Sequence, residues 1–207
     1  MNESRTFARF WAFATKHEDK HTREARRQLA GGARGRVLEI GCGVGANFPY
    51  YGDAATEIIA TEPNPHMLTA AREAAAARRN IIVQSARAES LPFDDASFDT
   101  VLSTLNMCTI DDPPRALAEI RRVLKPGGQY RFFDHVRYDH AFGRFWQNLA
   151  DPLWSRLLGA GCHLNRDIAA MIRAAGFRDV DLTFEKQLPP IPPVVLVRPH
   201  IRGTATA

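Results

Sequence analysis

The stretch VLEIGCGVGANF, Val37 to Phe48, decides the fold, because an apolar run is followed directly by a loop rich in glycine. A short run of branched apolar residues that ends in glycine is typical of a buried strand. Gly41, Gly43 and Gly45 let the backbone turn sharply and approach a ligand, since glycine has no Cβ in the way. Ligands of open parallel sheets bind at the carboxyl ends of the strands. We therefore expect this loop to contact a nucleotide-like ligand.

The spacing of these glycines argues against two other kinds of nucleotide site. The pattern is GxGxG, whereas dinucleotide folds carry GxGxxG, which aims a helix N-terminus at the pyrophosphate. The chain also contains no GxxxxGK[ST] sequence, which excludes a P-loop. The glycine loop alone is a weak signal, so a nicotinamide-dependent oxidoreductase stays a second, less favoured hypothesis.

Strand-like and helix-like segments alternate along much of the chain. Buried strands are predicted at residues 36–40, 57–61, 80–84, 98–104 and 129–136. Helices are predicted over 63–79, with Asn64 as cap and Pro65 in the first turn, and over 112–125, before the stop signal Pro126-Gly127-Gly128. This alternation predicts an α/β fold with a parallel sheet covered on both faces.

Two regions lie outside the alternation. Residues 3–30 are expected to be helical and to carry an aromatic cluster, Phe7, Phe10, Trp11 and Phe13. Residues 142–161 predict a helix with Phe145, Trp146 and Trp154, followed by a helix over 165–177 closed by Gly176 and by strands in 179–186 and 198–206. These aromatic residues either belong to the core or cover an apolar acceptor site, and we favour a lid.

Composition limits the partners. The chain has 207 residues, of which 45% are hydrophobic and 24% charged, as in an ordinary globular domain. The net charge of +4 comes from arginines scattered over the helices, which predicts solvated helix faces and no nucleic-acid partner. No apolar run is long enough to span a bilayer, and the N-terminus lacks signal-peptide features, so we expect a cytoplasmic protein without a membrane anchor.

The cysteines are expected to be reduced thiols. Cys42, Cys108 and Cys162 cannot all pair, and none shows CxxC spacing. Cys162 adjoins His163, but no other residues supply tetrahedral ligands at a sensible spacing, so no metal site is predicted.

An acidic residue follows the second predicted strand. Glu62 stands at the position from which a carboxylate accepts hydrogen bonds from both ribose hydroxyls of a nucleotide. The alternative is a solvated loop carboxylate. Glu62 and the glycine loop together favour an adenosine-containing ligand.

Four motifs give the chain a specific resemblance. EIGCGVGAN at 39–47, TEPNP at 61–65, AESLPF at 88–93 and RVLKPGG at 122–128 are similar in order and spacing to motifs of the class I S-adenosylmethionine-dependent methyltransferases, in the branch with the ubiquinone and menaquinone methyltransferases. The resemblance implies a Rossmann-like fold with a mostly parallel seven-stranded sheet, helices on both faces and an N-terminal helical lid. It also implies one domain over 1–207: a lid at 1–30, a cofactor-binding core at 36–136 and substrate-side elements at 137–207.

The resemblance carries over to individual residues of the cofactor site. In this family the glycine loop lies under methionine and ribose, the acid holds the ribose, and the Ala-Glu pair reaches adenine. The residues implied to bind S-adenosylmethionine are Glu39, Gly41, Cys42, Gly43, Gly45, Asn47, Glu62, Pro63, Met67, Ala88, Glu89 and Asn106. The family often has Asp before the Ala-Glu pair, whereas this chain has Arg87, so Glu89 or the main chain must replace that contact. For Asn106, a turn-forming role is nearly as well supported.

The C-terminal third resembles a narrower group. FDHV at 133–136, FWQNLADPLW at 145–154, GCHLNRD at 161–167 and LVRPHIRG at 196–203 are similar to small thiol S-methyltransferases of the methyltransferase-like type. The mammalian members carry an N-terminal hydrophobic anchor that this sequence lacks. The resemblance implies methyl transfer to a small, largely apolar acceptor, with a thiol favoured.

Methyl transfer to a thiol needs the thiolate, so a base near the ends of the fourth and fifth strands would help. Asp134 and His135 are the preferred catalytic candidates, and His163 and His200 are further ones, although a single histidine is more often structural. Alternatives are an O-, N- or C-methyltransferase and a cofactor-binding protein of this fold that transfers no methyl group. The partner is a small molecule, and the protein is expected to be a monomer or homodimer.

Overall fold

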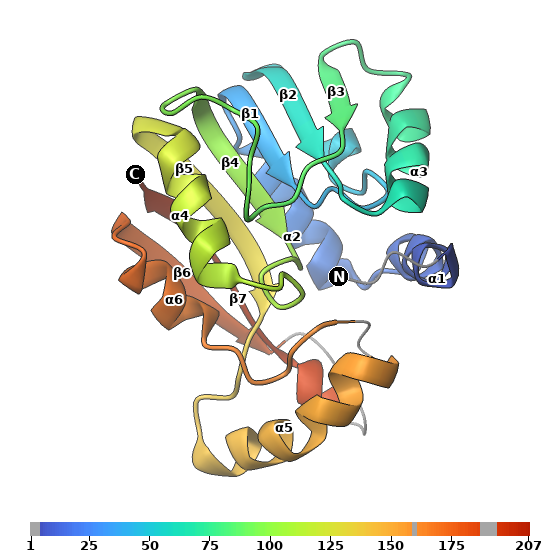
Figure 1. Cartoon of the computed structure of the whole chain (residues 1–207), viewed down its shortest axis with the longest axis vertical. Helices are drawn as coiled ribbons and strands as arrows, with labels where there is room; N and C mark the ends of the chain where they lie inside the picture. The colour runs from blue at the N-terminus through green and yellow to red at the C-terminus, as the bar shows by residue number, and fades with distance from the viewer. Residues whose placement is uncertain (1–4, 159–160, 187–193) are drawn as a thin grey trace.

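One sheet of seven strands, in the order β3-β2-β1-β4-β5-β7-β6, organises the chain (Figure 1). The computed structural model describes residues 5–158, 161–186 and 194–207. The strands are β1 (Gly35–Ile40), β2 (Ala55–Thr61), β3 (Ile81–Gln84), β4 (Phe98–Thr104), β5 (Leu124–His135), β6 (Arg178–Lys186) and β7 (Pro199–Thr206). The first five strands pair in parallel, and β7 runs antiparallel between β5 and β6. The prediction of a mostly parallel seven-stranded sheet is confirmed.

The helices are α1 (Arg5–Lys16), α2 (Lys20–Gly31), α3 (Pro65–Ala75), α4 (Pro113–Val123), α5 (Ala141–Leu153) and α6 (Ile168–Ala174), with short turns η1 (Phe48–Tyr50), η2 (Trp154–Leu158, π-helical) and η3 (Val194–Val197). Four of them form two layers on the sheet, α2 with α3 and α4 with α6. Apolar residues of α2 and α3 pack with β1 and β2 in one cluster, and those of α4 and α6 pack with β4 and β5 in another. The sheet therefore has a separate core on each face, because parallel strands expose apolar side chains on both sides.

Local signals in the sequence set the helix starts. The Asn64 side chain accepts hydrogen bonds from the backbone N–H groups of His66 and Met67, with Pro65 in the first turn, as predicted. Asp112 caps α4 in a similar way by accepting from the N–H of Arg115. These caps fix where the helices on the two faces begin.

The N-terminal segment differs from the predicted single helical region. It forms two helices, and Asp19 caps the second by accepting from the N–H groups of His21 and Thr22. Helix α2 belongs to the layer on the sheet, because Leu29 is buried and its carbonyl accepts a hydrogen bond from Arg131 on β5. Residues 20–30 of the expected 1–30 lid therefore belong to the sheet layer, and for α1 the lid stays a prediction.

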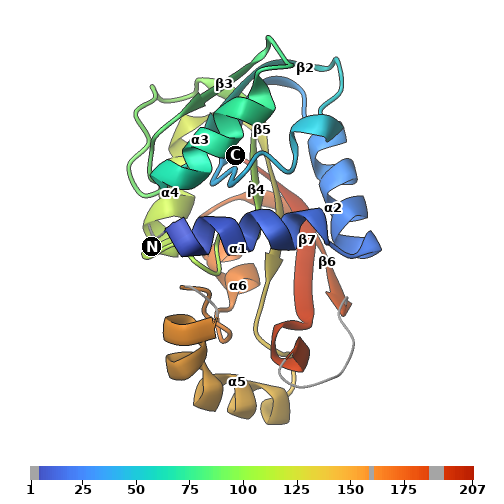
Figure 2. The same ribbon diagram turned by 90° about the vertical axis from the view of Figure 1, so that its right-hand side faces the viewer.

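Helix α5 lies at one end of the molecule, apart from the two helix layers (Figure 2). The predicted helix over 142–161 ends as an α-helix at Leu153, and residues 159–160 lie outside the described residues. Large apolar side chains of α5 are exposed: Phe142, Phe145, Trp146, Leu149 and Leu153. The exposure of Phe145 and Trp146 rules out the core alternative for these two residues. No helix in the described part of the chain is both long and apolar enough to cross a membrane.

Candidate functional site

A cleft opens at the carboxyl ends of β1, β2 and β4, where the strand order reverses. It encloses about 720 Å³ of empty space, including the part that is open to solvent. Clefts at this switch point are the usual ligand sites of open α/β sheets. The lining residues are Trp11, Thr15, Arg26, Glu39, Gly41, Cys42, Gly43, Val44, Ala46, Asn47, Glu62, Met67, Thr104, Leu105, Asn106 and Thr109.

The cleft contains eight of the twelve residues expected to bind the cofactor: Glu39, Gly41, Cys42, Gly43, Asn47, Glu62, Met67 and Asn106. Gly45, Pro63, Ala88 and Glu89 are not part of its lining. Sequence reasoning missed Arg26 and Thr15, because helical periodicity does not reveal that the break at Asp19 brings two helices to this rim.

The glycine loop is held in place by Asn106, which follows β4. Gly41 has a φ of +59°, and a Cβ there would lie 2.2 Å from the side-chain oxygen of Asn106. The Asn106 amide donates to the carbonyl of Ile40 at 2.7 Å. Gly43 has a φ of +58° and open space where its Cβ would be. The loop therefore offers bare backbone to a ligand at Gly43, and Asn106 fixes its start.

Glu62 is buried at the end of β2. Its carboxylate accepts hydrogen bonds from the N–H of Gly43 and from the N–H of Asn64, both at 2.9 Å. Burial raises the pKa of Glu62, and these two N–H groups partly offset the increase. A carboxylate has about four acceptor positions, so capacity is left for the two hydroxyls of a ribose. The residues present fit an adenosine group.

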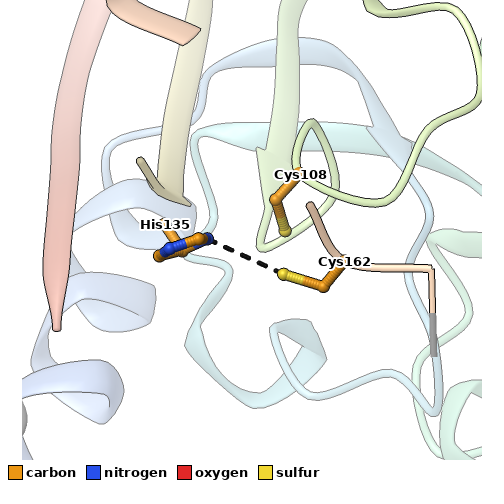
Figure 3. Close-up of side chains that lie close together, drawn as sticks. All are labelled: Cys108, His135 and Cys162. Atoms are coloured by element: carbon orange, nitrogen blue, oxygen red, sulfur yellow. Dashed lines mark hydrogen bonds between the residues drawn. The ribbon is translucent and has the colours of Figure 1, made fainter. Parts of the chain in front are cut away.

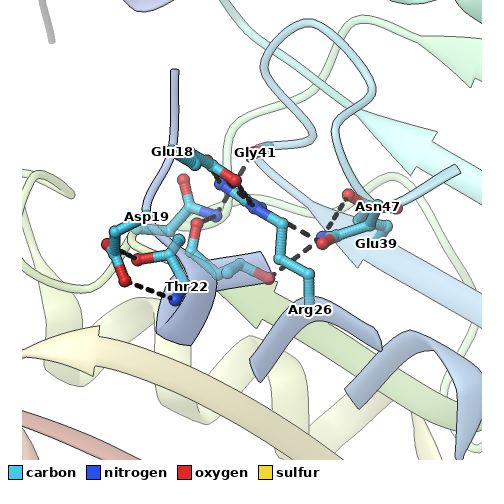
Figure 4. A network of polar contacts seen from close by, with 9 residues as sticks. Glu18, Asp19, Thr22, Arg26, Glu39, Gly41 and Asn47 are labelled. Atoms are coloured by element: carbon cyan, nitrogen blue, oxygen red, sulfur yellow. Dashed lines mark hydrogen bonds and ion pairs between the residues drawn. The ribbon is translucent and has the colours of Figure 1, made fainter. Parts of the chain in front are cut away.

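A second buried carboxylate, Glu39, anchors a polar network at the floor of the cleft (Figure 4). It accepts from the Asn47 side chain at 2.9 Å and from the Tyr51 hydroxyl at 2.7 Å. Arg26 of α2 donates to the side-chain oxygen of Asn47 at 3.1 Å and forms an ion pair with Glu18 at 2.6 Å. Burial raises the pKa of Glu39 to about 7, although its hydrogen bonds act in the opposite direction.

The expected adenine side contains a small ionic cluster. The Glu89 carboxylate accepts from the N–H of Asp111 at 3.2 Å and from Arg87 at 3.4 Å. Arg87 also pairs with the Asp111 side chain. The other Glu89 oxygen is buried and meets no hydrogen-bond donor among the described residues. Arg87 therefore offsets the negative charge of Glu89 and Asp111. It stands at the position where the family often has Asp.

The two catalytic candidates at the end of β5 lie outside the cleft lining. Asp134 is buried, and burial raises its pKa to about 8, so the carboxyl group is mostly protonated at neutral pH. Nearby N–H groups of the Asn106–Cys108 turn lower the pKa partly, yet no donor among the described residues meets full hydrogen-bond geometry with the carboxyl group.

His135 is buried beside two cysteines that lie far from it in the sequence (Figure 3). Its Nδ1 lies 3.7 Å from the sulfur of Cys162, and Cys108 completes the cluster. The Cys108 thiol and His135 hold the pKa of Cys162 well below the usual thiol range, against the effect of burial. The expectation of no metal site rested on the spacing of possible ligands along the sequence. The structure brings together three possible ligands that are distant in the sequence.

The other two histidines have separate partners. His163 lies 3.0 Å from the Asp151 carboxylate through Nδ1, and not in the cluster with Cys162. His200 stacks on Phe133, and burial lowers its pKa to about 4, which keeps it neutral. Neither lines the cleft.

Together, the strand order, the bare glycine loop and the buried acid after β2 define a class I nucleotide-cofactor site of the methyltransferase kind. A methyltransferase-domain family model matches residues 38–132. Human thiol S-methyltransferase TMT1B is 35% identical over 192 residues, which cover 88% of this chain and 77% of that protein. Human thiol S-methyltransferase TMT1A is 34% identical over 176 residues, which cover 82% of this chain and 69% of TMT1A.

The chain belongs to the S-adenosylmethionine-dependent methyltransferases, in the group that contains the thiol S-methyltransferases TMT1A and TMT1B. A solved Thermotoga maritima methyltransferase, described as a possible histamine N-methyltransferase, covers 97% of both chains at 25% identity with a TM-score of 0.66. The [4+2]-cyclase SpnF shares the fold at 20% identity with a TM-score of 0.69. S-adenosylmethionine is the cofactor of this enzyme.

Replacing Glu39 by Gln is expected to remove a pH dependence of stability. The pKa of Glu39 is raised from 4.5 to about 7 in the folded state, so between these values the native state holds a proton that the unfolded state has lost. The contribution of Glu39 to the free energy of unfolding therefore falls as pH rises through this window, by on the order of 2–3 kcal/mol. The free energy of unfolding of the wild type and of Glu39→Gln is measured by urea unfolding at several pH values from about 5 to 8.

The half-exposed Glu24 on α2 supplies the control, and Glu24→Gln should keep the wild-type slope. If the stability of Glu39→Gln follows pH in parallel with the wild type, Glu39 does not titrate in this window.

Proposed function

We propose that this enzyme transfers the methyl group of S-adenosylmethionine to the sulfur of a small, largely apolar thiol. The observation that carries the proposal is the extent of the similarity to the thiol S-methyltransferases. It covers 88% of the chain, whereas the methyltransferase-domain model ends at residue 132. The similarity thus includes segments after β5, which were expected to lie on the substrate side.

The twelve residues expected to bind the cofactor are assigned to distinct parts of it, and eight of them line the cleft. In the proposal, Glu62 accepts from the ribose hydroxyls, and the backbone of the loop from Gly41 through Gly45 lies under ribose and methionine. Glu39, Cys42, Asn47 and Asn106 are assigned to the methionine side, and Pro63, Met67, Ala88 and Glu89 to the adenine side. Buried carboxylates such as Glu39 and Glu62 also match the positive charge of an amino acid ammonium and a sulfonium.

The bound cofactor supplies a methyl group on a positively charged sulfur. The chain aligns the acceptor sulfur behind the methyl carbon, excludes water and favours the thiolate. The sulfur lone pair forms the new C–S bond while the sulfonium C–S bond breaks, and S-adenosylhomocysteine leaves. Of the two catalytic candidates, His135 is proposed to assist loss of the thiol proton, because it ends β5, which pairs with β4, and the end of β4 lines the cleft. Asp134 is not assigned this role, because its carboxyl group is mostly protonated at neutral pH.

A screen of acceptors tests the function. Purified protein with radiolabelled S-adenosylmethionine should methylate small aryl and alkyl thiols, and shape-matched phenols and amines should react at least tenfold more slowly. Brisk transfer to oxygen, nitrogen or carbon with none to sulfur would overturn the thiol proposal in favour of the alternative acceptors. Cofactor binding without transfer to any acceptor would instead favour a non-methylating role, for which the SpnF fold is a precedent.

Glu62→Gln is expected to weaken binding of S-adenosylhomocysteine by about 10–100-fold, because a hydrogen bond to a charged group contributes about 1.5–3 kcal/mol. The amide keeps the size of the side chain and removes the negative charge and one acceptor oxygen. Isothermal titration calorimetry measures the change. Glu57→Gln on β2, the strand that Glu62 follows, is the matched control, since Glu57 pairs with Arg36 outside the cleft lining. Equal affinity in both variants would remove Glu62 from the ribose site.

The proposed lid over the cofactor cleft is α1, the first helix of the expected 1–30 segment. Trp11 and Thr15 line the cleft, whereas Phe13 of the same helix is 62% exposed. The side chains of Phe7 and Phe10 lie outside the described part of the structure. Trp154 is assigned to the acceptor side with the elements of 137–207.

Trp11→Ala is expected to lower kcat/KM for a bulky thiol by at least fivefold and to change S-adenosylhomocysteine affinity less, because a lid acts on the assembled complex. Phe13→Ala, on the exposed face of the same helix, should behave as the wild type. Steady-state kinetics and calorimetry on both variants decide the matter. Equal effects of the two substitutions would contradict a lid.

The setting of the enzyme completes the proposal. We propose a cytoplasmic enzyme that acts on a small molecule as a monomer or homodimer, without a nucleic-acid partner. Three cysteines with no disulfide among them fit a reducing compartment.

A further inference from the structure

Cys108, His135 and Cys162 meet at the carboxyl edge of the sheet although they come from three distant segments. Cys108 lies in the turn after β4, His135 ends β5, and Cys162 precedes α6 (Figure 3). Their sulfur and nitrogen atoms all lie within 4.8 Å of one another, and the Nδ1 of His135 is 3.7 Å from the Cys162 sulfur. Figure 3 shows the three side chains pointing toward a common point.

The backbone around the cluster is fixed by hydrogen bonds. Arg166 donates to the carbonyls of Met107 at 2.7 Å and Ile110 at 2.6 Å, which holds the turn that carries Cys108. The N–H of His163 donates to the carbonyl of Cys108 at 2.8 Å, which ties this turn to the segment that carries Cys162. The three side chains are therefore positioned by the fold and not by chance contact on a surface.

We propose that Cys108, His135 and Cys162 form a binding site for one soft divalent cation of the Zn²⁺ type. Zn²⁺ binds thiolate sulfur at about 2.3 Å and imidazole nitrogen at about 2.0–2.1 Å, so its ligand atoms lie roughly 3.5 Å apart. The observed separations of up to 4.8 Å need a contraction of at most about 1.3 Å to reach this spacing. Two thiolates and a neutral imidazole cancel the charge of the ion, which suits a buried site.

Three protein ligands leave one position of a tetrahedral ion open, as in catalytic zinc sites. Resting on the function proposed above, this position takes the acceptor sulfur. The acceptor R–SH binds as R–S⁻ and releases its proton to solvent, and the sulfur then attacks the methyl carbon. Thr109, which follows Cys108 in the sequence, lines the cofactor cleft, so the turn that carries Cys108 reaches the proposed site of the methyl donor. The product is a neutral thioether, a weaker ligand than a thiolate, and can leave.

Metal binding can be measured without cofactor and without turnover. Reduced, chelator-treated protein is titrated with Co²⁺ alone, which reports thiolate ligation through a charge-transfer band, and with Zn²⁺ against a coloured chelator. Wild-type protein should bind one ion per chain. Cys108→Ser and Cys162→Ser should weaken binding by at least tenfold, whereas Cys42→Ala, which removes a buried cysteine outside the cluster, should not.

Circular dichroism and thermal unfolding show whether each variant is folded, and the half-buried Cys162 gives a variant less prone to misfolding than the buried Cys108. Absence of stoichiometric binding to the wild type, or equal loss in Cys42→Ala, would overturn the metal site. So would a Cys108–Cys162 disulfide in protein purified without reductant, if the reduced protein also fails to bind metal.

The open position has its own readout. A small apolar thiol should change the spectrum of the cobalt-loaded protein, and the alcohol of the same shape should not. If the spectrum of the cobalt-loaded protein does not change when the thiol is added, the proposal that the ion binds the acceptor sulfur is wrong. These outcomes are independent of the acceptor screen, since metal can bind to an enzyme that methylates oxygen, and thiol methylation can proceed in a protein that binds no metal.

Discussion

The buried carboxylate of Glu39 is the constraint on which the cofactor cleft depends. It sits at the end of the central strand β1, and desolvation of its charge has to be offset by donors on other elements. Tyr51 supplies one donor from the segment after η1, and Asn47 supplies another from the glycine loop. Asn47 in turn accepts from Arg26, so α2 is fixed to the same network. Strand, loop and helix are thus positioned together by one acid.

Features that depend on residues close together in the sequence could be predicted from it. The Asn64-Pro65 pair predicted the start of α3, and the GxGxG spacing and Glu62 predicted the cofactor edge of the sheet, because each depends on backbone geometry close by. The expectation of a mostly parallel sheet of seven strands came from the resemblance. The strand order and the antiparallel β7 between β5 and β6 were not predicted and come from the structure.

Contacts between segments that are distant along the chain could not be predicted from the sequence. Arg26 reaches the cleft only because the chain breaks at Asp19, and nothing in the periodicity of residues 3–30 locates the partner of that arginine. The cluster of Cys108, His135 and Cys162 is a similar case, since ligand spacing along the chain has no meaning when a sheet gathers the ligands. Exposure of the aromatic face of α5 was also hidden, because an apolar stripe has the same pattern whether it is covered or not.

One turn couples the two halves of the proposed reaction. Asn106 lies in the turn after β4, and its side-chain amide donates to the carbonyl of Ile40, which precedes the glycine loop. The geometry of this turn therefore affects the position of the proposed methyl donor. Two residues later the same turn carries Cys108, and Arg166 holds it by the carbonyls of Met107 and Ile110. A shift of this turn would therefore move the donor loop and the acceptor cluster together. Methyl transfer needs the donor carbon and the attacking atom in line, and a shared rigid turn is a direct way for the fold to keep that alignment.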